Sequence, residues 1–169
     1  MLNKKALSAT APGVETDDNF NSTVLLLHGD GTNGAQNNTF LDSSTNAFSI
    51  TRNGNTTQGT FTPYGTLWSN YFGGVSGNYL APQSATSSTN FGTSDFTVEF
   101  WVYLNSLSQG AANSYGVAVA TLFPSAGWQV QVTDSGNGTP STIAWDTFSV
   151  TVAASSNALS ATTWTHVAV

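Results

Sequence analysis

The sequence has no cysteine and very little charge. Among 169 residues, the absence of cysteine excludes a disulfide scaffold and a thiolate metal site. Only 7% of the residues are charged, with three Lys or Arg against nine Asp or Glu. Affinity for DNA or RNA comes mainly from Lys and Arg on phosphates, so this balance excludes nucleic acid as a partner.

Long apolar runs and helical periodicity are also missing. The longest aliphatic run is VLLL, and the opening MLNKKALSATAPG is too polar for a signal sequence. We therefore predict no signal peptide, no transmembrane segment and no membrane insertion. Residues 1–22 follow neither a helical nor a strand period, so we expect a flexible arm before a domain that spans residues 23–169.

Short apolar or alternating segments, separated by Gly, Asn, Ser and Pro, fill the chain from Thr23 onward and predict an all-β sandwich. The expected strands are 23–29, 47–52, 57–62, 69–73, 78–82, 95–104, 115–123, 127–133, 142–152 and 163–169. Asn53-Gly54 and residues 135–138 predict hairpin turns, because Asn and Gly tolerate the positive φ that such turns need.

Alternation assigns faces to the strands. The residues expected to face the core are Phe96, Val98, Phe100, Val102, Leu104, Trp128, Val130, Val132, Val167 and Val169. The residues expected on the opposite faces are Thr97, Glu99, Trp101, Tyr103, Gln129, Gln131, Thr133, Trp164 and His166. The pattern predicts an apolar inner face and an outer face of amides, hydroxyls and aromatics.

Three segments carry a family resemblance: VLLLHGDGTNGAQNNTFLDSS (24–44), YFGGVSGNYLAPQ (71–83) leading into FGTSDFTVEFWV (91–102), and LSATTWTHVAV (159–169). On these residues the chain resembles the LamG-like jelly-roll domains of the concanavalin A-like lectin/glucanase class. The resemblance implies two antiparallel sheets stacked face to face. Such domains continue beyond this last strand, so we expect the final strands to be missing.

The stretch LLHGDGTNGAQNNTFLDSS followed by ITRNGNTTQGTFTPYG is similar to domains in virion proteins of marine tailed bacteriophages. The similarity implies a non-catalytic structural protein on the virion surface, assembled in the host cytoplasm as a capsid decoration or a tail-fibre-associated protein. Its N-terminal arm would bind other virion proteins, and the formation of a homo-oligomer is an open alternative. The alternative function is lectin-like binding of host polysaccharide, and the third is glycoside hydrolysis.

Catalysis would have to use Glu99. A retaining glycosidase needs two carboxyl groups about 5–5.5 Å apart, and related sandwich glucanases carry them in a Glu-x-Asp-x-x-Glu array. Thr97 and Trp101 flank Glu99 on its face, and Asp95 lies about 13 Å away along a strand. We therefore expect no enzyme activity.

Calcium is the metal that the residue types favour, and no cofactor is required. Asp30 and Asp42 carry the oxygen ligands that Ca²⁺ prefers, and they could equally cap turns. Where relatives read YFDGSGDYL, Gly73 and Asn78 replace two possible carboxylates. The two histidines, His28 and His166, have no triad or zinc context, and we interpret them as structural.

Sugar recognition suits the outer face, because aromatic rings contact the apolar side of a pyranose while amides and hydroxyls match its hydroxyls. The candidate residues are Trp101, Tyr103, Gln129, Gln131, Thr133 and His166. The alternative is that the arm or loops cover the two aromatics. Loop aromatics that offer other glycan or protein contacts are Tyr64, Trp68 and Tyr115.

Deletion of residues 1–20 tests the predicted arm. We expect the shortened protein to be missing from purified phage particles, because the arm supplies the tether to the virion. Quantitative immunoblotting of particles made with full-length and shortened chains measures this, and equal incorporation would contradict the tether.

Overall fold

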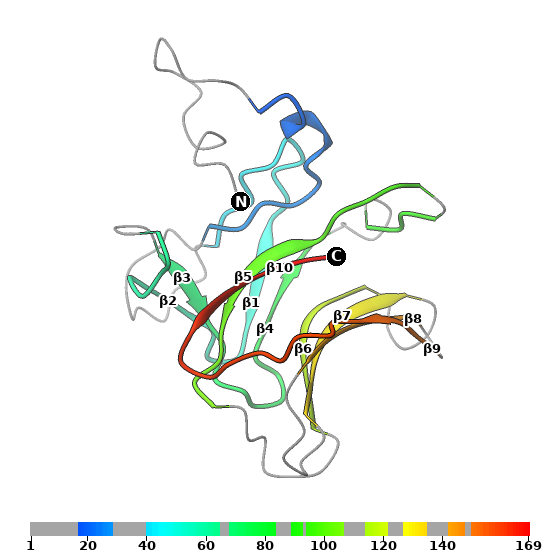
Figure 1. Ribbon diagram of the computed structural model, residues 1–169. Helices are drawn as coiled ribbons and strands as arrows, with labels where there is room; N and C mark the ends of the chain where they lie inside the picture. The colour runs from blue at the N-terminus through cyan, green and yellow to red at the C-terminus, as the bar shows by residue number, and fades with distance from the viewer. Residues whose placement is uncertain are drawn as a thin grey trace. The chain divides into compact units, whose positions relative to one another are not determined.

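The regular structure is almost entirely β (Figure 1). The computed structural model describes residues 17–28, 40–64, 68–83, 89–92, 94–106, 114–121, 127–134, 142–147 and 150–169, and of residues 114–121, 133 and 134 it describes the backbone. Within these ranges the only helical element is the 3-10 turn η2 (Phe20–Ser22). No helix in this part of the chain is long and apolar enough to cross a bilayer. The all-β prediction is confirmed.

The chain divides into two compact units, residues 1–88 and residues 89–169. In the first unit, β1 (Ile50–Asn53) pairs antiparallel with β4 (Tyr79–Pro82). In the same unit, β2 (Thr57–Gly59) pairs antiparallel with β3 (Ser69–Tyr71). The strands predicted at 47–52, 57–62, 69–73 and 78–82 are present here in shortened form.

The predicted hairpin at Asn53-Gly54 is wrong, although the turn itself forms. Gly54 has a φ of +64°, and a Cβ at this position would lie 2.0 Å from Asn78 Oδ1. Asn78 Oδ1 also accepts a hydrogen bond from the backbone N–H of Asn55 (3.0 Å). The turn therefore packs against the loop before β4, and β1 takes β4 as its partner while β2 takes β3.

The predicted strand at residues 23–29 is also wrong for its described part. Residues 23–28 contain one isolated bridge, between Leu27 and Asp42. The carboxylate of Asp42 accepts the backbone N–H of Leu26 at 2.9 Å, in place of a second ladder bond. Asp side chains commonly compete with strand ladders in this way.

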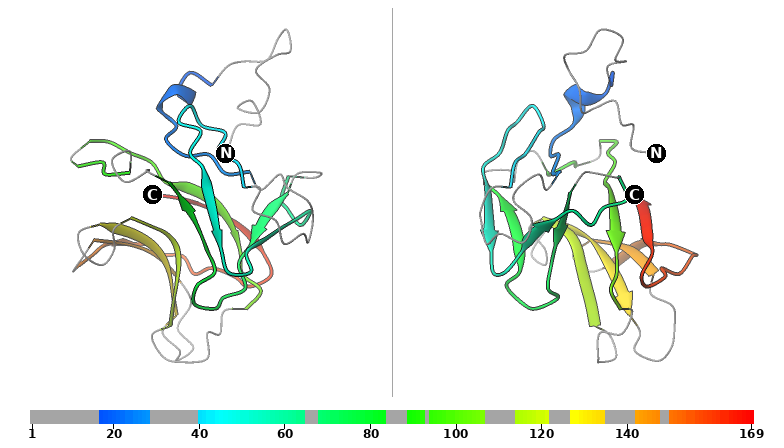
Figure 2. Two further views of the ribbon diagram at one scale, coloured as in Figure 1. Left: turned by 180° about the vertical axis from the view of Figure 1, so that it is seen from behind. Right: turned by 90° about the vertical axis from the view of Figure 1, so that its left-hand side faces the viewer.

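The second unit contains two antiparallel sheets, which form separate layers in Figures 1 and 2. One pairs β5 (Glu99–Tyr103) with β10 (Trp164–Ala168). The other has the order β6-β7-β8-β9, and its strands are β6 (Ser114–Thr121), β7 (Trp128–Asp134), β8 (Thr142–Thr147) and β9 (Val150–Ala154). The pairing of β7 with β8 confirms the hairpin predicted around residues 135–138, which themselves lie outside the described residues.

The single strand predicted at 142–152 is in fact two strands. β8 and β9 pair with each other, from Thr147 opposite Val150 to Ala144 opposite Ala154. The sequence carries a signal of this break, because the apolar positions change parity between Trp145 and Val150. If residues 142–152 formed one continuous strand, their apolar side chains would lie on one face up to Trp145 and on the opposite face from Val150 onward.

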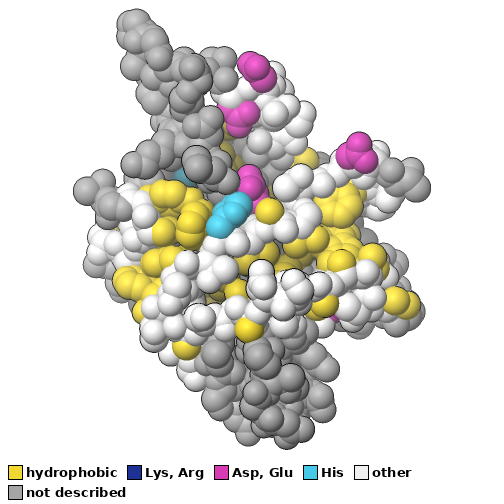
Figure 3. Space-filling model, viewed as in Figure 1, with side chains coloured by type: hydrophobic (Ala, Val, Ile, Leu, Met, Phe, Trp, Pro, Cys, Tyr) yellow, Lys and Arg dark blue, Asp and Glu magenta, His cyan; other side chains and the backbone are white. Residues whose placement is uncertain are grey.

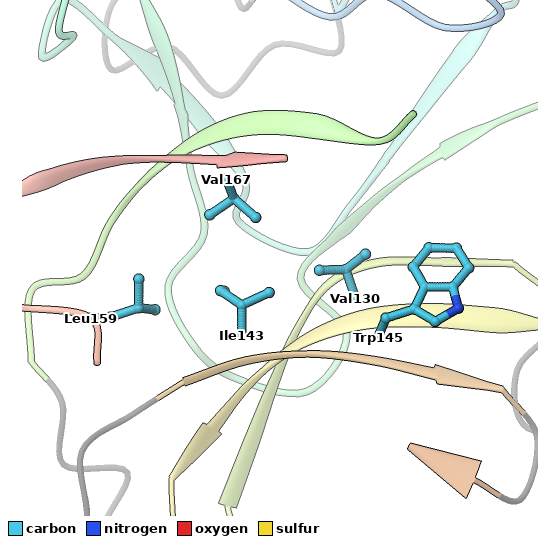
Figure 4. Close-up of a cluster of buried hydrophobic side chains, with 5 residues drawn as sticks. All are labelled: Val130, Ile143, Trp145, Leu159 and Val167. Carbon is cyan, nitrogen blue, oxygen red and sulfur yellow. The ribbon is translucent and has the colours of Figure 1, made fainter. Parts of the chain in front are cut away.

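The hydrophobic core of the second unit lies between its two sheets. Its buried members are Val130, Ile143, Trp145, Leu159 and Val167 (Figure 4). Around them pack Val98, Phe100, Val102, Leu104, Trp128, Val132 and Val169. The predicted inner faces of β5, β7 and β10 are thus confirmed, and each such side chain stabilises the fold by about 1.5–3 kcal/mol.

Four aromatic rings close one end of this core. Trp145 stacks on Trp128 and on Phe96, with centroid distances of 4.6 and 5.0 Å, and Phe91 stacks on Phe96 and on Trp128 at 4.7 and 5.4 Å. Trp128 Nε1 donates to the carbonyl of Thr89 at 3.0 Å. Phe96, expected in the core, is exposed on its far side. The rings fix the segment before β5 onto β7 and β8.

Replacement of Ile143 by Ala tests this core. We expect a loss of about 2–5 kcal/mol in the free energy of unfolding, because the change removes buried methyl groups and leaves a cavity. The matched control is Val152→Ala, at an exposed position on β9, with an expected change within about 0.5 kcal/mol. Denaturant unfolding followed by tryptophan fluorescence measures both, and equal effects would contradict the assignment of the core.

Candidate functional site

The outer face of the β5–β10 sheet carries two cross-strand aromatic pairs. Trp101 lies directly opposite His166, and Tyr103 lies directly opposite Trp164. The ring centroids are 5.2 Å apart in the first pair and 5.4 Å apart in the second, and both pairs are tilted. All four side chains are half-buried. We call this surface, together with Glu99, the aromatic face.

Glu99 provides the charge on the aromatic face. Its direct cross-strand neighbour, Ala168, has no polar side chain, and the carboxylate lies instead beside the diagonal neighbour. The distance from Glu99 Oε2 to His166 Nε2 is 3.3 Å, which allows an ion pair when the imidazole is protonated. The side chain of Glu99 is 41% exposed and that of His166 is 23% exposed. Solvent therefore reaches Glu99, whereas the Nε2 atom of His166 is buried.

The outer face of β7 differs from what alternation predicted. Gln129 and Gln131 do point away from the core, but they are only 5% and 9% exposed. Gln129 Nε2 donates to Gln131 Oε1 at 2.9 Å and to Asp146 Oδ2 at 3.2 Å. The expectation that these amides are exposed is wrong. The side chain of Thr133 lies outside the described residues.

Asp146 and Trp164 were not predicted as members of these polar and aromatic groups. Asp146 is 6% exposed and lies directly opposite Gln129 on β8. A hairpin centred on residues 135–138 would place Ala144 opposite Gln129, so the predicted turn did not identify this pair. Trp164 was assigned to the outer face, and the facing Tyr103 on β5 was the signal that the two rings meet.

Asp42 acts as a hydrogen-bond acceptor for the chain around it. Its Oδ1 accepts the backbone N–H groups of Leu26 and Ser44, and its Oδ2 accepts the N–H of Phe48 and the hydroxyl of Ser44, each at 2.9 Å. Partial burial by itself raises the pKa of Asp42. The hydrogen bonds outweigh burial, and the pKa lies below its ordinary value of 3.8.

A calcium site at Asp30 and Asp42 stays a prediction. Asp30 lies outside the described residues, and the four hydrogen bonds occupy both oxygens of Asp42. Across the described ranges, no three His, Cys, Asp or Glu side chains gather where they could hold a metal ion. A pocket of about 460 Å³ beside Asp42 is lined by residues 40–42 and 47–50, and the carboxylate of Asp42 in its wall already accepts these hydrogen bonds.

The other candidate residues belong to neither β5 nor β10. Tyr64 and Trp68 are half-buried within the first unit, as is His28. The side chain of Tyr115 lies outside the described residues, although its backbone belongs to β6. The structure therefore brings together Trp101, Tyr103 and His166 from the predicted set.

A family model described as the concanavalin A-like lectin/glucanases superfamily matches residues 73–169, which is more than half of the chain. The chain belongs to this superfamily. The matched segment includes β5 and β10 and therefore the whole aromatic face, whereas Asp30 and Asp42 precede it. Membership of the superfamily supports a carbohydrate-binding type of module. No curated protein and no solved structure matches the chain.

Replacement of Asp42 by Asn tests the role of its carboxylate. The amide has one acceptor oxygen in place of two, so we expect a loss of about 1–3 kcal/mol in the free energy of unfolding at pH 7. The pKa of Asp42 is lower in the folded protein than in the unfolded chain. The extra stability of the wild type over the variant is therefore fully present above the unfolded pKa near 3.8. It is lost as the pH falls through the lower, folded pKa.

Urea unfolding of the wild type and the variant between pH 7 and pH 2.5 measures this difference. The control is Asp18→Asn, at an exposed position in the same unit, with an expected change within about 0.5 kcal/mol. If the wild type and Asp42→Asn differ by the same free energy of unfolding at pH 7 and at pH 2.5, the role assigned to the Asp42 carboxylate is refuted.

Proposed function

We propose that this chain is a non-catalytic carbohydrate-binding module that binds glycans through the aromatic face. The observation that carries the proposal is the pair of aromatic contacts that β5 and β10 place side by side on one surface. Successive residues on one face of a strand lie roughly 7 Å apart, so the two pairs form a continuous surface. Glu99 and His166 add polar groups at one end of it.

The chemistry of this surface suits a sugar. Aromatic rings pack against the apolar face of a pyranose, and a few polar groups at the edge fix its orientation through the hydroxyls. Half-buried rings contribute to affinity with little loss of side-chain entropy on binding, because packing in the free protein already restricts their rotamers. Membership of the lectin/glucanase superfamily supports the same class of ligand.

The absence of catalysis is part of the proposal. Glycoside hydrolysis needs two carboxyl groups, about 5–5.5 Å apart for retention or about 6.5–9.5 Å apart for inversion. The ionisable partner of Glu99 on the aromatic face is the imidazole of His166, and the direct neighbour across the strands is Ala168. Asp146, the buried acid of β8, binds Gln129 in the other sheet.

The place where the module works is a finer part of the same proposal. The similarity of residues 26–44 and 50–65 to virion proteins of marine tailed phages supports a position on the surface of a phage particle. A module there would hold host polysaccharide and so contribute to adhesion, as a tail-fibre-associated or capsid-decorating protein.

Replacement of Trp101 by Ala tests the aromatic face. We expect glycan affinity to fall by at least about tenfold, because an aromatic anchor at a binding surface is commonly worth 2 kcal/mol or more. A glycan array identifies the ligand and calorimetry measures its affinity. The matched control is Tyr71→Ala, which removes an exposed aromatic ring from the first unit and leaves affinity unchanged.

Three results would contradict the proposal. The wild type would bind no neutral, amino, carboxylated or sulfated glycan on the array. Alternatively, Trp101→Ala and Tyr103→Ala, shown by unfolding to be folded, would bind as tightly as the wild type. Release of reducing ends from a bound glycan, abolished by Glu99→Gln, would show an enzyme.

A further inference from the structure

The second unit has no permanent positive charge. Residues 89–169 contain no Lys or Arg, and their acids are Asp95, Glu99, Asp134 and Asp146. The three cations of the chain, Lys4, Lys5 and Arg52, belong to the first unit. No Lys or Arg side chain shows among the coloured atoms of Figure 3, where acids and a histidine reach the surface.

Proteins bind carboxylate and sulfate groups with Arg forks, Lys ammonium groups or the N-termini of helices. The second unit has neither cationic residue type, and its described residues form strands but no helix. The faces of aromatic rings carry the negative part of the ring quadrupole and attract cations. The faces of the aromatic rings are therefore unfavourable to an anion, and Glu99 adds a full negative charge beside them.

We infer that the aromatic face selects its ligand by charge: it accepts neutral or amino-bearing glycans, and Glu99 rejects glycans that carry carboxylate or sulfate groups. The inference rests on the proposed function and names the ligand class of that site. Glu99 is thereby a specificity-determining residue.

The position of Glu99 makes this rejection effective. It lies two residues from Trp101 on the same face, roughly 7 Å along the strand. The Debye length is about 8 Å at physiological ionic strength, so a charged group on a sugar stacked over Trp101 feels the carboxylate. At this distance of about 7 Å, the screened repulsion between two like charges at a protein surface weakens binding by up to about tenfold.

Asp95 provides a matched control. It is exposed and precedes Trp101 by six residues, up to about 20 Å along an extended chain. Asp95→Asn changes the net charge by the same amount as Glu99→Gln, but at a position six residues from Trp101 in place of two. Comparison of the two variants separates a local effect from the overall charge.

The experiment uses the full chain and oligosaccharides of equal length from three charge classes: glucosamine oligomers, glucose and N-acetylglucosamine oligomers, and uronate and sulfated oligomers. Calorimetry gives the affinity of each class at low and at physiological salt. For the wild type we expect the anionic class to bind up to about tenfold more weakly than the others. Glu99→Gln should narrow that gap severalfold, and Asp95→Asn should leave it unchanged.

A second measurement needs only the wild type. Any residual binding of anionic oligomers should strengthen as salt rises from 20 to 500 mM, because salt screens the repulsion, whereas binding of glucosamine oligomers should weaken.

The outcomes separate the two proposals. Anionic oligomers that bind the wild type as tightly as neutral ones, or a gap that Glu99→Gln leaves intact, would overturn the charge selection while the carbohydrate-binding function stands. Failure of all three classes to bind would overturn the function itself.

Discussion

The register between β5 and β10 is the constraint on which the second unit depends. It sets His166 opposite Trp101 and Trp164 opposite Tyr103, and so puts Phe100, Val102 and Val167 on the core side. Val98 and Val169 extend the ladder with two backbone hydrogen bonds of 2.9 Å. A slip of one residue would bury the aromatic face and expose the core, because side chains alternate with a period of two. Core formation therefore also assembles the candidate site.

The outer faces of the two sheets have different roles for a physical reason. On β7 and β8, Gln129 and Asp146 are almost fully buried, and one amide group of Gln129 binds both Gln131 and Asp146. A buried amide without such partners would cost several kcal/mol relative to water, so these bonds serve stability. On β5 and β10, by contrast, Glu99 stays in contact with solvent. A ligand can therefore reach Glu99, whereas Gln129 and Asp146 are covered.

Alternation predicted the faces of β5, β7 and β10 because each strand has one side packed on a core. It could not show which outer faces are covered, since the period of two gives the direction of a side chain and says nothing about what lies above it. Gln129 and Gln131 were misjudged for this reason. The change of parity between Trp145 and Val150 was readable but was overlooked, and one strand was predicted where β8 and β9 form two.

The pairing of β1 shows a different limit of the sequence. Asn53-Gly54 is a strong local turn signal, and the turn forms, yet β1 pairs with a strand that begins some two dozen residues later. The deciding contact is Asn78 against Gly54 and Asn55, which is a tertiary contact and has no local signature. Sequence reasoning therefore identifies turns more securely than it identifies partners.

The scarcity of charge gives each exposed charge a clear local effect. With four acids and no Lys or Arg, the second unit has no broad field to steer a ligand, and its acids act only over a Debye length. An exposed carboxylate keeps its hydration and therefore changes the free energy of unfolding little. Glu99 is thus not required for the stability of the fold. Its contact with His166 leaves it solvent-accessible beside Trp101. The proposed site would bind its ligand through rings and discriminate through one acid, and this role requires no second carboxyl group.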